Sequence, residues 1–324
     1  MKVSLIVCTR NPRKDFFQKC IKSLLSQEWD QKYEIIVVDN NSEFNIRKFC
    51  VGQKKIKWVC EKKVGLTAAR LKGFQKSKGN LLVFVDDDNV LASNYIKTCA
   101  ALSSTNMKTG VWSAEVTGKF ETKAPQWVEK YYPFLALISY TKDKASNHSD
   151  GGTLPIGAGM VVRRSVMESY ARELSNCPIR SNLDRRPGSL MAAGDTDIGY
   201  TALKLGYACC YTKRLKVQHL ISKERLNPNY LYKLAREVSA SHQLLRCIHE
   251  NKEFSLKEKL KMAAAKIISP FVSKKSKYGF KAAVLIGKWE GHSMHHKIYK
   301  SMRNRPPAKT SLMNQQKNHD REPK

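Results

Sequence analysis

The 324-residue sequence has few acidic residues, no paired-cysteine motif and no long apolar run. Only 28 Asp and Glu residues stand against 58 Lys and Arg residues, so the formal net charge is +30. This excess predicts an anionic partner, a class that includes nucleic acids, phosphorylated substrates and anionic membrane surfaces. No apolar segment approaches the ~20 residues that a membrane-spanning helix needs, so we expect no such helix.

The nine cysteines include no CxxC pair and no Cys/His spacing typical of a metal site. Cys8, Cys20, Cys99 and Cys209 stand in apolar settings, where a reduced thiol behaves as a small hydrophobic side chain. The pattern argues against a disulfide scaffold and predicts reduced thiols in a cytoplasmic protein. The first residues read as a strand and not as a signal peptide, which predicts the same location.

Apolar strand-like runs alternate with helical segments in the first part of the chain. The runs cover residues 3–8, 35–38, 56–59 and 81–85, and between them apolar residues recur at helical spacing. A continuous apolar run predicts a strand buried on both faces, and alternation with helices predicts a parallel sheet. The predicted fold class is therefore α/β, with a mainly parallel, Rossmann-like sheet.

Three acidic residues, Asp86, Asp87 and Asp88, directly follow the run of residues 81–85. Ligands of open α/β sheets bind beyond the carboxyl ends of the strands. Adjacent carboxylates repel one another, and a divalent cation bound together with substrate phosphates offsets that repulsion. A solvated acidic loop is the alternative, but in so basic a chain the metal site is favoured.

The order of these motifs resembles the family 2 glycosyltransferases, which have the GT-A fold. The resemblance rests on Thr9 and Arg10 after the first strand, Asp39 after the second, residues 65–70 at a helix start, and the three acids. It implies an inverting transfer of a sugar from a nucleotide-diphosphate donor, commonly a UDP-sugar. The implied acceptor is a hydroxyl of a polysaccharide or glycolipid, and the implied GT-A catalytic domain covers residues 1–225.

The resemblance also implies roles for individual residues. Asp39 would accept a hydrogen bond from the base, and Asp86 or Asp87 would reach the ribose hydroxyls. The residues implied to bind the nucleotide sugar are Thr9, Arg10, Asp39, Gly65, Arg70, Asp86 and Asp87. The residues implied to hold Mn²⁺ or Mg²⁺ are Asp88, Asp86 and His219. Basic groups at Arg10, Arg70 and Arg163 would offset the remaining phosphate charge.

A second acidic cluster, residues 193–200, precedes a helical segment. Gly194 stands where the family usually has Glu, Asp195 takes the position of the family's Asp, and Asp197 keeps a second carboxylate nearby. A carboxylate within reach of the acceptor hydroxyl is the simplest general base, so Asp195 is the predicted catalytic residue. Asp195 and Thr196 could instead cap the helix, and the two interpretations are compatible.

Two parts of the chain keep alternatives open. Residues 117–153 read as irregular, and their aromatic residues, among them Trp127 and Tyr131, could line an acceptor groove or fill a core. Residues 226–302 read as a helical extension with 21 Lys and Arg against 7 Asp and Glu from residue 226 to the end. Its apolar stripe predicts either a helix on an anionic membrane surface or packing on the catalytic domain. Residues from 303 onward are predicted to be disordered.

Two other functions fit parts of the sequence. A sugar-phosphate nucleotidyltransferase would have a similar sheet and similar acids, but it usually needs a glycine-rich loop that residues 9–12 lack. A basic nucleic-acid-binding protein would fit the charge, but the chain has no recognisable binding motif and its two acidic clusters would repel phosphates. We therefore expect a glycosyltransferase with a nucleotide-sugar donor, a saccharide or lipid-linked acceptor, and no nucleic-acid partner. A location at the inner face of a membrane follows if the extension binds lipid.

Overall fold

The computed structural model describes residues 1–177, 179–180, 183–251 and 253–303. Four parallel strands form the N-terminal half of the central sheet, in the order β3-β2-β1-β4. They are β1 (Val3–Thr9), β2 (Glu34–Asp39), β3 (Ile56–Cys60) and β4 (Leu81–Asp86). These strands coincide with the apolar runs of the sequence, so the predicted α/β fold class is confirmed.

The sheet continues with strands of mixed direction, in the order β8-β6-β9-β5 beyond β4. These are β8 (Val161–Arg163), β6 (Thr109–Phe120), β9 (Ala208–Ile221) and β5 (Asn89–Leu91), and β7 (Lys144–Ser146) pairs with β9. Strand β8 is antiparallel to β4 and β6, whereas β6 and β9 are parallel. Because β8 is antiparallel to β4, its last residue, Arg163, lies opposite Leu81, the first residue of β4.

Helices cover both faces of the sheet because the side chains of each strand alternate in direction. Leu5 and Val7 of β1 face helices α1 (Lys14–Leu25) and α3 (Tyr95–Thr105). Ile6 and Cys8 face the other side, where α2 (Leu66–Lys76), α4 (Arg164–Asn176) and α5 (Gly194–Lys204) pack. The buried parallel strands are thus apolar on both faces, as the sequence predicted.

The sequence also predicts that residues 155–162 enter a strand and that residues 215–220 form a last short strand, and the structure differs from these two predictions and from the irregular region 117–153. Residues 156–160 do not form the start of a strand, because Gly159 has a positive φ of 70° and Met160 N–H donates to the Gly157 carbonyl oxygen. The short strand predicted around residues 215–220 is part of the longer β9. The region 117–153 is only partly irregular, since it contains the end of β6, a 3₁₀ segment η2 (Gln126–Leu135) and β7.

Among the aromatic residues of η2, Phe134 lines the cavity at the sheet edge, whereas Trp127 and Tyr131 belong to a core. Tyr131 is fully buried, packs edge-on against Phe280, and joins an apolar cluster that also contains Leu231 and Leu234. Trp127 packs edge-on against Tyr131. Of the two interpretations left open, the core is therefore the one that the structure supports for Trp127 and Tyr131.

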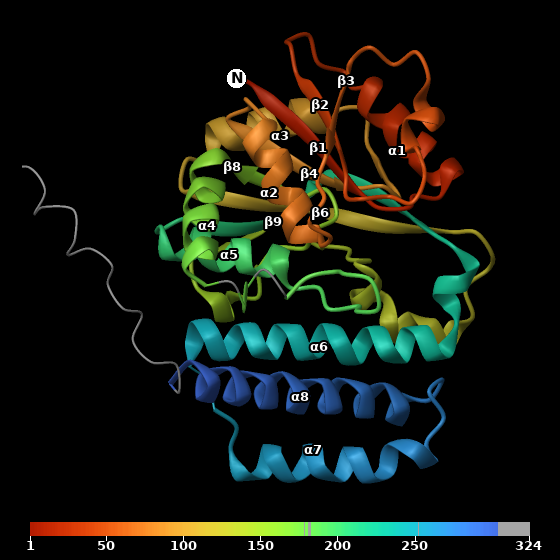
Figure 1. Cartoon of the computed structure of the whole chain (residues 1–324), viewed down its shortest axis with the longest axis vertical. Helices are drawn as coiled ribbons and strands as arrows, with labels where there is room; N and C mark the ends of the chain where they lie inside the picture. Colours follow the sequence, from red (N-terminus) through yellow and green to blue (C-terminus); the bar gives the residue numbers. More distant parts are fainter. Residues whose placement is uncertain (178, 181–182, 252, 304–324) are drawn as a thin grey trace, which may run out of the picture.

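The C-terminal part consists of three long helices stacked below the sheet (Figure 1). Helix α6 (Pro228–Glu250) lies nearest the sheet, α8 (Lys277–Arg303) lies beneath it, and α7 (Leu256–Ile268) is outermost. Close approach of α6 and α8 requires glycine, because a Cβ at Gly287 or Gly291 would overlap a backbone carbonyl oxygen of α6. Among the residues that the structure describes, no helix is long and apolar enough to cross a membrane.

Candidate functional site

The carboxyl ends of the parallel strands meet at one edge of the sheet. Thr9 lies opposite Asp39 in the β1–β2 register, and Cys8 lies opposite Asp86 in the β1–β4 register. A cavity of about 600 Å³ opens at this edge. Its walls come from the strand ends, from the start of α2, from residues 155–158, and from residues of α5 and β9.

Nine of the predicted site residues line this one cavity: Thr9, Arg10, Gly65, Arg70, Asp86, Asp87, Asp88, Asp195 and His219. The tenth, Asp39, ends β2 beside them but is not part of the cavity wall. One of its carboxylate oxygens accepts a hydrogen bond from Ser42 N–H at 2.9 Å, which shapes the following turn. The geometry brings the predicted set together, whereas the role of each residue stays a prediction.

The three acids at the end of β4 are half-buried and lie side by side. Burial raises the pKa of Asp86 and of Asp87, and the neighbouring Asp88 charge raises both further. Thr9 donates a short hydrogen bond to Asp87, which partly opposes that rise in pKa. Burial also disfavours the charged form of Asp88, but His219 and Arg225 outweigh it and the pKa of Asp88 is lowered. Asp88 is thus the acid that its neighbours hold ionised.

The surroundings of Asp88 fit a divalent cation. The pairing of β5 with β9 sets Asn89 opposite His219, and this brings His219 Nε2 to 3.2 Å from Asp88 Oδ2. His219 Nδ1 lies 2.9 Å from the Leu135 carbonyl oxygen and so donates to it, which leaves Nε2 with the lone pair whenever the ring is neutral. A second hydrogen bond that fixes the tautomer in this way is typical of metal-binding histidines.

A positive group already lies between these two acceptors. Arg225 Nη1 donates to Asp88 Oδ2 at 2.9 Å and to His219 Nε2 at 2.8 Å. The guanidinium thus offsets the repulsion between two acceptor atoms that face each other. An oxygen and an imidazole nitrogen at this spacing suit Mn²⁺, and oxygen ligands suit Mg²⁺, so the donor set fits the predicted ion.

Asp184 is a buried acid at the site that the sequence analysis missed. Its Oδ2 accepts a hydrogen bond from Arg70 Nη1 at 2.9 Å, and Thr67 Oγ1 donates to the same oxygen at 3.2 Å. Both ion-pair side chains are almost fully buried. A Cβ at Gly194 would overlap Asp184 Oδ2, so the missing side chain at Gly194 leaves room for this carboxylate.

Replacing Asp184 by Ala is expected to lower the free energy of unfolding by about 3–5 kcal/mol, because it leaves the Arg70 guanidinium buried without its partner. Urea denaturation measures the change. The control is Glu43→Ala, which removes an exposed partner of Arg10 and is expected to cost less than about 1 kcal/mol. Equal, small losses in both variants would show that the buried pair does not stabilise the fold.

Asp195 lies at the N-terminal end of α5, with its carboxylate fixed at the cavity wall. Oδ2 accepts a hydrogen bond from Gly157 N–H at 2.6 Å and Oδ1 accepts one from Thr196 N–H at 2.7 Å. The N-cap residue of α5 is Ala193, without a side-chain capping hydrogen bond, so Asp195 lies inside the first turn of α5 and does not cap it. Asp197 points elsewhere, into a buried network with Arg180 and His249, so the suggestion that it supplies a second carboxylate nearby is wrong.

Arg163 does not contribute to this cavity. Its guanidinium donates to the carbonyl oxygens of Thr109, Ser103 and Asn106. In the antiparallel β4–β8 register Arg163 lies opposite Leu81, at the end of β4 remote from the acids. The prediction that it offsets phosphate charge is therefore wrong.

Other arginines take the place that the sequence analysis gave to Arg163. Arg185, Arg186 and Arg225 line the cavity together with Arg10 and Arg70. Residues 183–187 have no helical or strand periodicity, so no pattern pointed to the first two. Arg225 follows His219 by six residues. A basic residue so close in sequence to the predicted metal ligand was a signal that could have pointed to Arg225 as a site residue.

Comparison with known proteins agrees with this geometry. The model of the family described as glycosyl transferase family 2 matches residues 4–171, slightly more than half of the chain. The glucosyl-dolichyl phosphate glucuronosyltransferase of Haloferax volcanii is 26% identical over 175 residues, which cover 51% of this chain and 54% of that protein. Glycosyltransferase GlyA of Streptococcus pneumoniae is 29% identical over 101 residues, which cover 30% of this chain and 14% of that protein. These matches span from about one seventh to about half of the relatives' own length.

The fold also has a counterpart among solved structures. The crystal structure of S. aureus TarS has a TM-score of 0.51 to this chain at 15% sequence identity. The likeness covers 93% of this chain and 55% of that chain. At this identity it shows a shared fold, which extends over the sheet and the C-terminal helices alike.

Proposed function

This chain belongs to glycosyl transferase family 2, and from that premise we propose that it transfers a sugar from a nucleotide-diphosphate donor to a hydroxyl acceptor with inversion at the anomeric carbon. The observation that carries the proposal is the shared cavity, in which Asp88, His219 and Arg225 face Asp195. Residues 1–225 would form the catalytic domain and residues 226–302 its helical extension. A uridine nucleotide is the proposed carrier of the sugar.

The donor would bind along the strand ends. Thr9, Arg10 and Asp39 lie together at the ends of β1 and β2 and would contact the base and ribose. Gly65, the N-cap residue of α2, lines the cavity with a positive φ of 141°, and its N–H donates to Asn40 Oδ1. Cavity-lining arginines would offset the charge of the diphosphate.

Asp88, Asp86 and His219 would hold Mn²⁺ or Mg²⁺. When bound, such an ion stabilises the negative charge that develops on the diphosphate as the bond to the sugar breaks. Arg225 would then leave its position between Asp88 and His219 and turn its guanidinium toward the phosphates. Asp195 would accept the proton of the attacking hydroxyl, with its carboxylate already oriented by Gly157 and Thr196.

A panel of nucleotide sugars tests the donor proposal directly. Thermal stabilisation by one uridine-diphosphate sugar in the presence of Mn²⁺, with hydrolysis to the free nucleotide, is the expected result. Release of pyrophosphate from a nucleoside triphosphate and a sugar phosphate would instead indicate a nucleotidyltransferase and would overturn the proposal.

We also propose that the acceptor is lipid-linked and that the protein works on the cytoplasmic face of a membrane. The Haloferax relative is named for a sugar on dolichyl phosphate. Support from this chain comes from α7, which packs on its neighbours through Met262 and Ala265. Its opposite face exposes apolar side chains at Leu256, Leu260 and Ile267. Phe271, three residues after the end of α7, is 85% exposed.

The charges around this apolar stripe favour an anionic bilayer as its occupant. At 100° per residue, lysines flank the stripe on both sides, with Lys257 and Lys261 on one and Lys259 and Lys266 on the other. An outward apolar face with basic flanks is what a helix in the interface of an anionic membrane requires. Packing on the catalytic domain, which the sequence predicts as the alternative to membrane binding, applies to α6 and to the inner face of α8.

Vesicle co-sedimentation tests the membrane proposal. Full-length protein is expected to bind phosphatidylglycerol vesicles but not phosphatidylcholine vesicles, and binding should weaken as salt rises. The double variant Ile267→Asp, Phe271→Asp is expected to lose about tenfold or more in binding, because two apolar side chains no longer enter the lipid. The control is Val51→Asp, which changes an exposed apolar residue far from α7 and should bind like the wild type. Unchanged binding of the double variant would contradict the proposal.

A further inference from the structure

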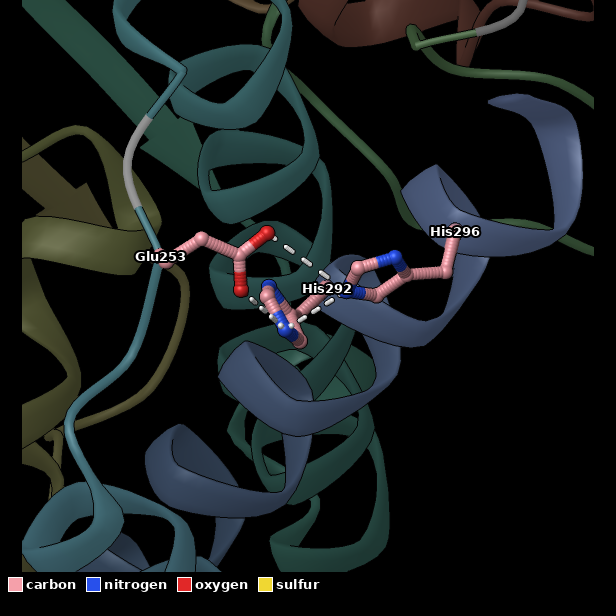
Figure 2. A group of neighbouring side chains, drawn as sticks. All are labelled: Glu253, His292 and His296. Carbon is pink, nitrogen blue, oxygen red and sulfur yellow. Dashed lines mark hydrogen bonds and ion pairs between the residues drawn. The ribbon is translucent and has the colours of Figure 1, made fainter. Parts of the chain in front are cut away.

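A second group of metal-ligating side chains lies among the C-terminal helices, away from the cavity. It consists of Glu253, His292 and His296, whose ligand atoms all lie within 4.8 Å of one another (Figure 2). His292 and His296 are four residues apart on α8, so they lie on one face of the helix. Glu253 comes from the connection between α6 and α7, and its carboxylate points toward both imidazole rings.

The spacing of the ligand atoms matches a tetrahedral site. His292 Nε2 and His296 Nε2 are 3.0 Å apart, and the carboxylate oxygens of Glu253 lie 3.3 Å from the first and 3.6 Å from the second. Ligand atoms bound to one zinc ion at about 2.0 Å lie about 3.3 Å from each other in a tetrahedron. The two imidazole nitrogens and the Glu253 carboxylate, which reaches the two rings through different oxygens, thus already stand near the corners that such an ion needs.

The protonation of the two rings supports the same conclusion. At 3.0 Å the two Nε2 atoms share either a proton, as in an N–H···N hydrogen bond, or a cation that both bind. His292 Nδ1 lies 3.7 Å from Cys247 Sγ, so the sulfur can accept a hydrogen bond from Nδ1–H, and in that tautomer Nε2 carries the lone pair.

We propose that Glu253, His292 and His296 bind a zinc-class transition-metal ion, with water as the fourth ligand. Water has access because the side chains of Glu253 and His296 are each 58% exposed. Two imidazole nitrogens favour zinc, cobalt or nickel over Mg²⁺. The ion ties the α6–α7 connection to α8 just before Ser255, the residue that caps α7, and so holds the start of the proposed membrane-facing helix.

Zinc binding by the full chain, prepared without a histidine tag, tests this site. Equilibrium dialysis against Zn²⁺ in excess Mg²⁺ is expected to leave one zinc per chain, and Co²⁺ is expected to give the visible absorption of a tetrahedral complex. Glu253→Gln and His296→Gln should each weaken zinc binding by about tenfold or more. Both residues are exposed, so neither substitution disturbs the core.

Two controls separate this site from the one at Asp88. Asp88→Asn should keep its zinc, and His148→Gln, a change of an exposed histidine that is not one of the three ligands, should bind zinc like the wild type. Loss of zinc in Asp88→Asn together with retention in His296→Gln would overturn the proposal, as would a wild-type protein that takes up no zinc. None of these readouts depends on sugar transfer, so the result stands apart from the proposed function.

Discussion

Replacement of Asp88 by Asn is expected to lower the rate of sugar transfer by about a thousandfold, the loss typical when one group that stabilises developing charge is removed. The substitution removes the ionised carboxylate oxygen that faces His219 Nε2 and accepts the hydrogen bond from Arg225. The Asp88 backbone carbonyl, which accepts a hydrogen bond from Leu220 N–H, is unchanged, so the β5–β9 pairing should persist.

The measurement is steady-state release of nucleotide from the donor identified in the panel, at saturating Mn²⁺. Asp30→Asn, at an exposed position outside the cavity, is the matched control and should transfer at the wild-type rate. Circular dichroism and the urea midpoint establish that the variant is folded. Transfer by Asp88→Asn within tenfold of the wild type, with the same response to chelator, would remove Asp88 from the metal site.

The sequence predicted the strand ends well because local chemistry determines them. Residues 81–85 are an uninterrupted apolar run, and a run of this kind can be buried only between helices on both faces of a sheet. The acids that follow must then lie at the sheet edge, next to Thr9 and Asp39 from neighbouring parallel strands. No long-range information was needed beyond the rule that such strands are parallel.

Contacts between distant segments could not be predicted in the same way. Arg163 was misplaced because the direction of β8 is not encoded in its own residues, and an antiparallel β8 carries Arg163 to the opposite edge. Asp184 was missed because its partner Arg70 is 114 residues away and the space it fills is defined by the absent side chain of Gly194. The stripe on α7 was visible in the sequence, but its outward direction depends on α8.

Arg225 changes the charge balance that the sequence predicted for the acidic cluster. From the sequence, three adjacent carboxylates required an external cation. In the structure a guanidinium from the turn after β9 already pairs with Asp88, and its Nη1 also reaches His219. The chain therefore supplies a positive partner for Asp88 itself, and the proposed ion would have to replace Arg225 as that partner.

The second large effect is expected at Asp195. Asp195→Asn should lower the turnover number for transfer by about 10²- to 10⁴-fold, the usual contribution of a general base. Donor affinity, measured by titration calorimetry, should stay near the wild-type value, because the base acts on the acceptor. Since both carboxylate oxygens accept backbone N–H groups, the Asn amide also loses one of these hydrogen bonds, and a modest fall in stability is expected.

A second variant separates proton transfer from positioning. Asp195→Glu keeps the charge but moves the carboxylate, and space is limited because a Cβ at Gly157 would already lie 3.2 Å from Asp195 Oδ2. We expect Asp195→Glu to be slow but to regain activity when acceptor concentration is raised, whereas Asp195→Asn should stay slow at saturating acceptor. Wild-type transfer by Asp195→Asn would exclude Asp195 as the base. Equal loss of donor binding and transfer would instead assign Asp195 to the donor side, where it holds Gly157 N–H and where its charge acts on the Arg70 guanidinium.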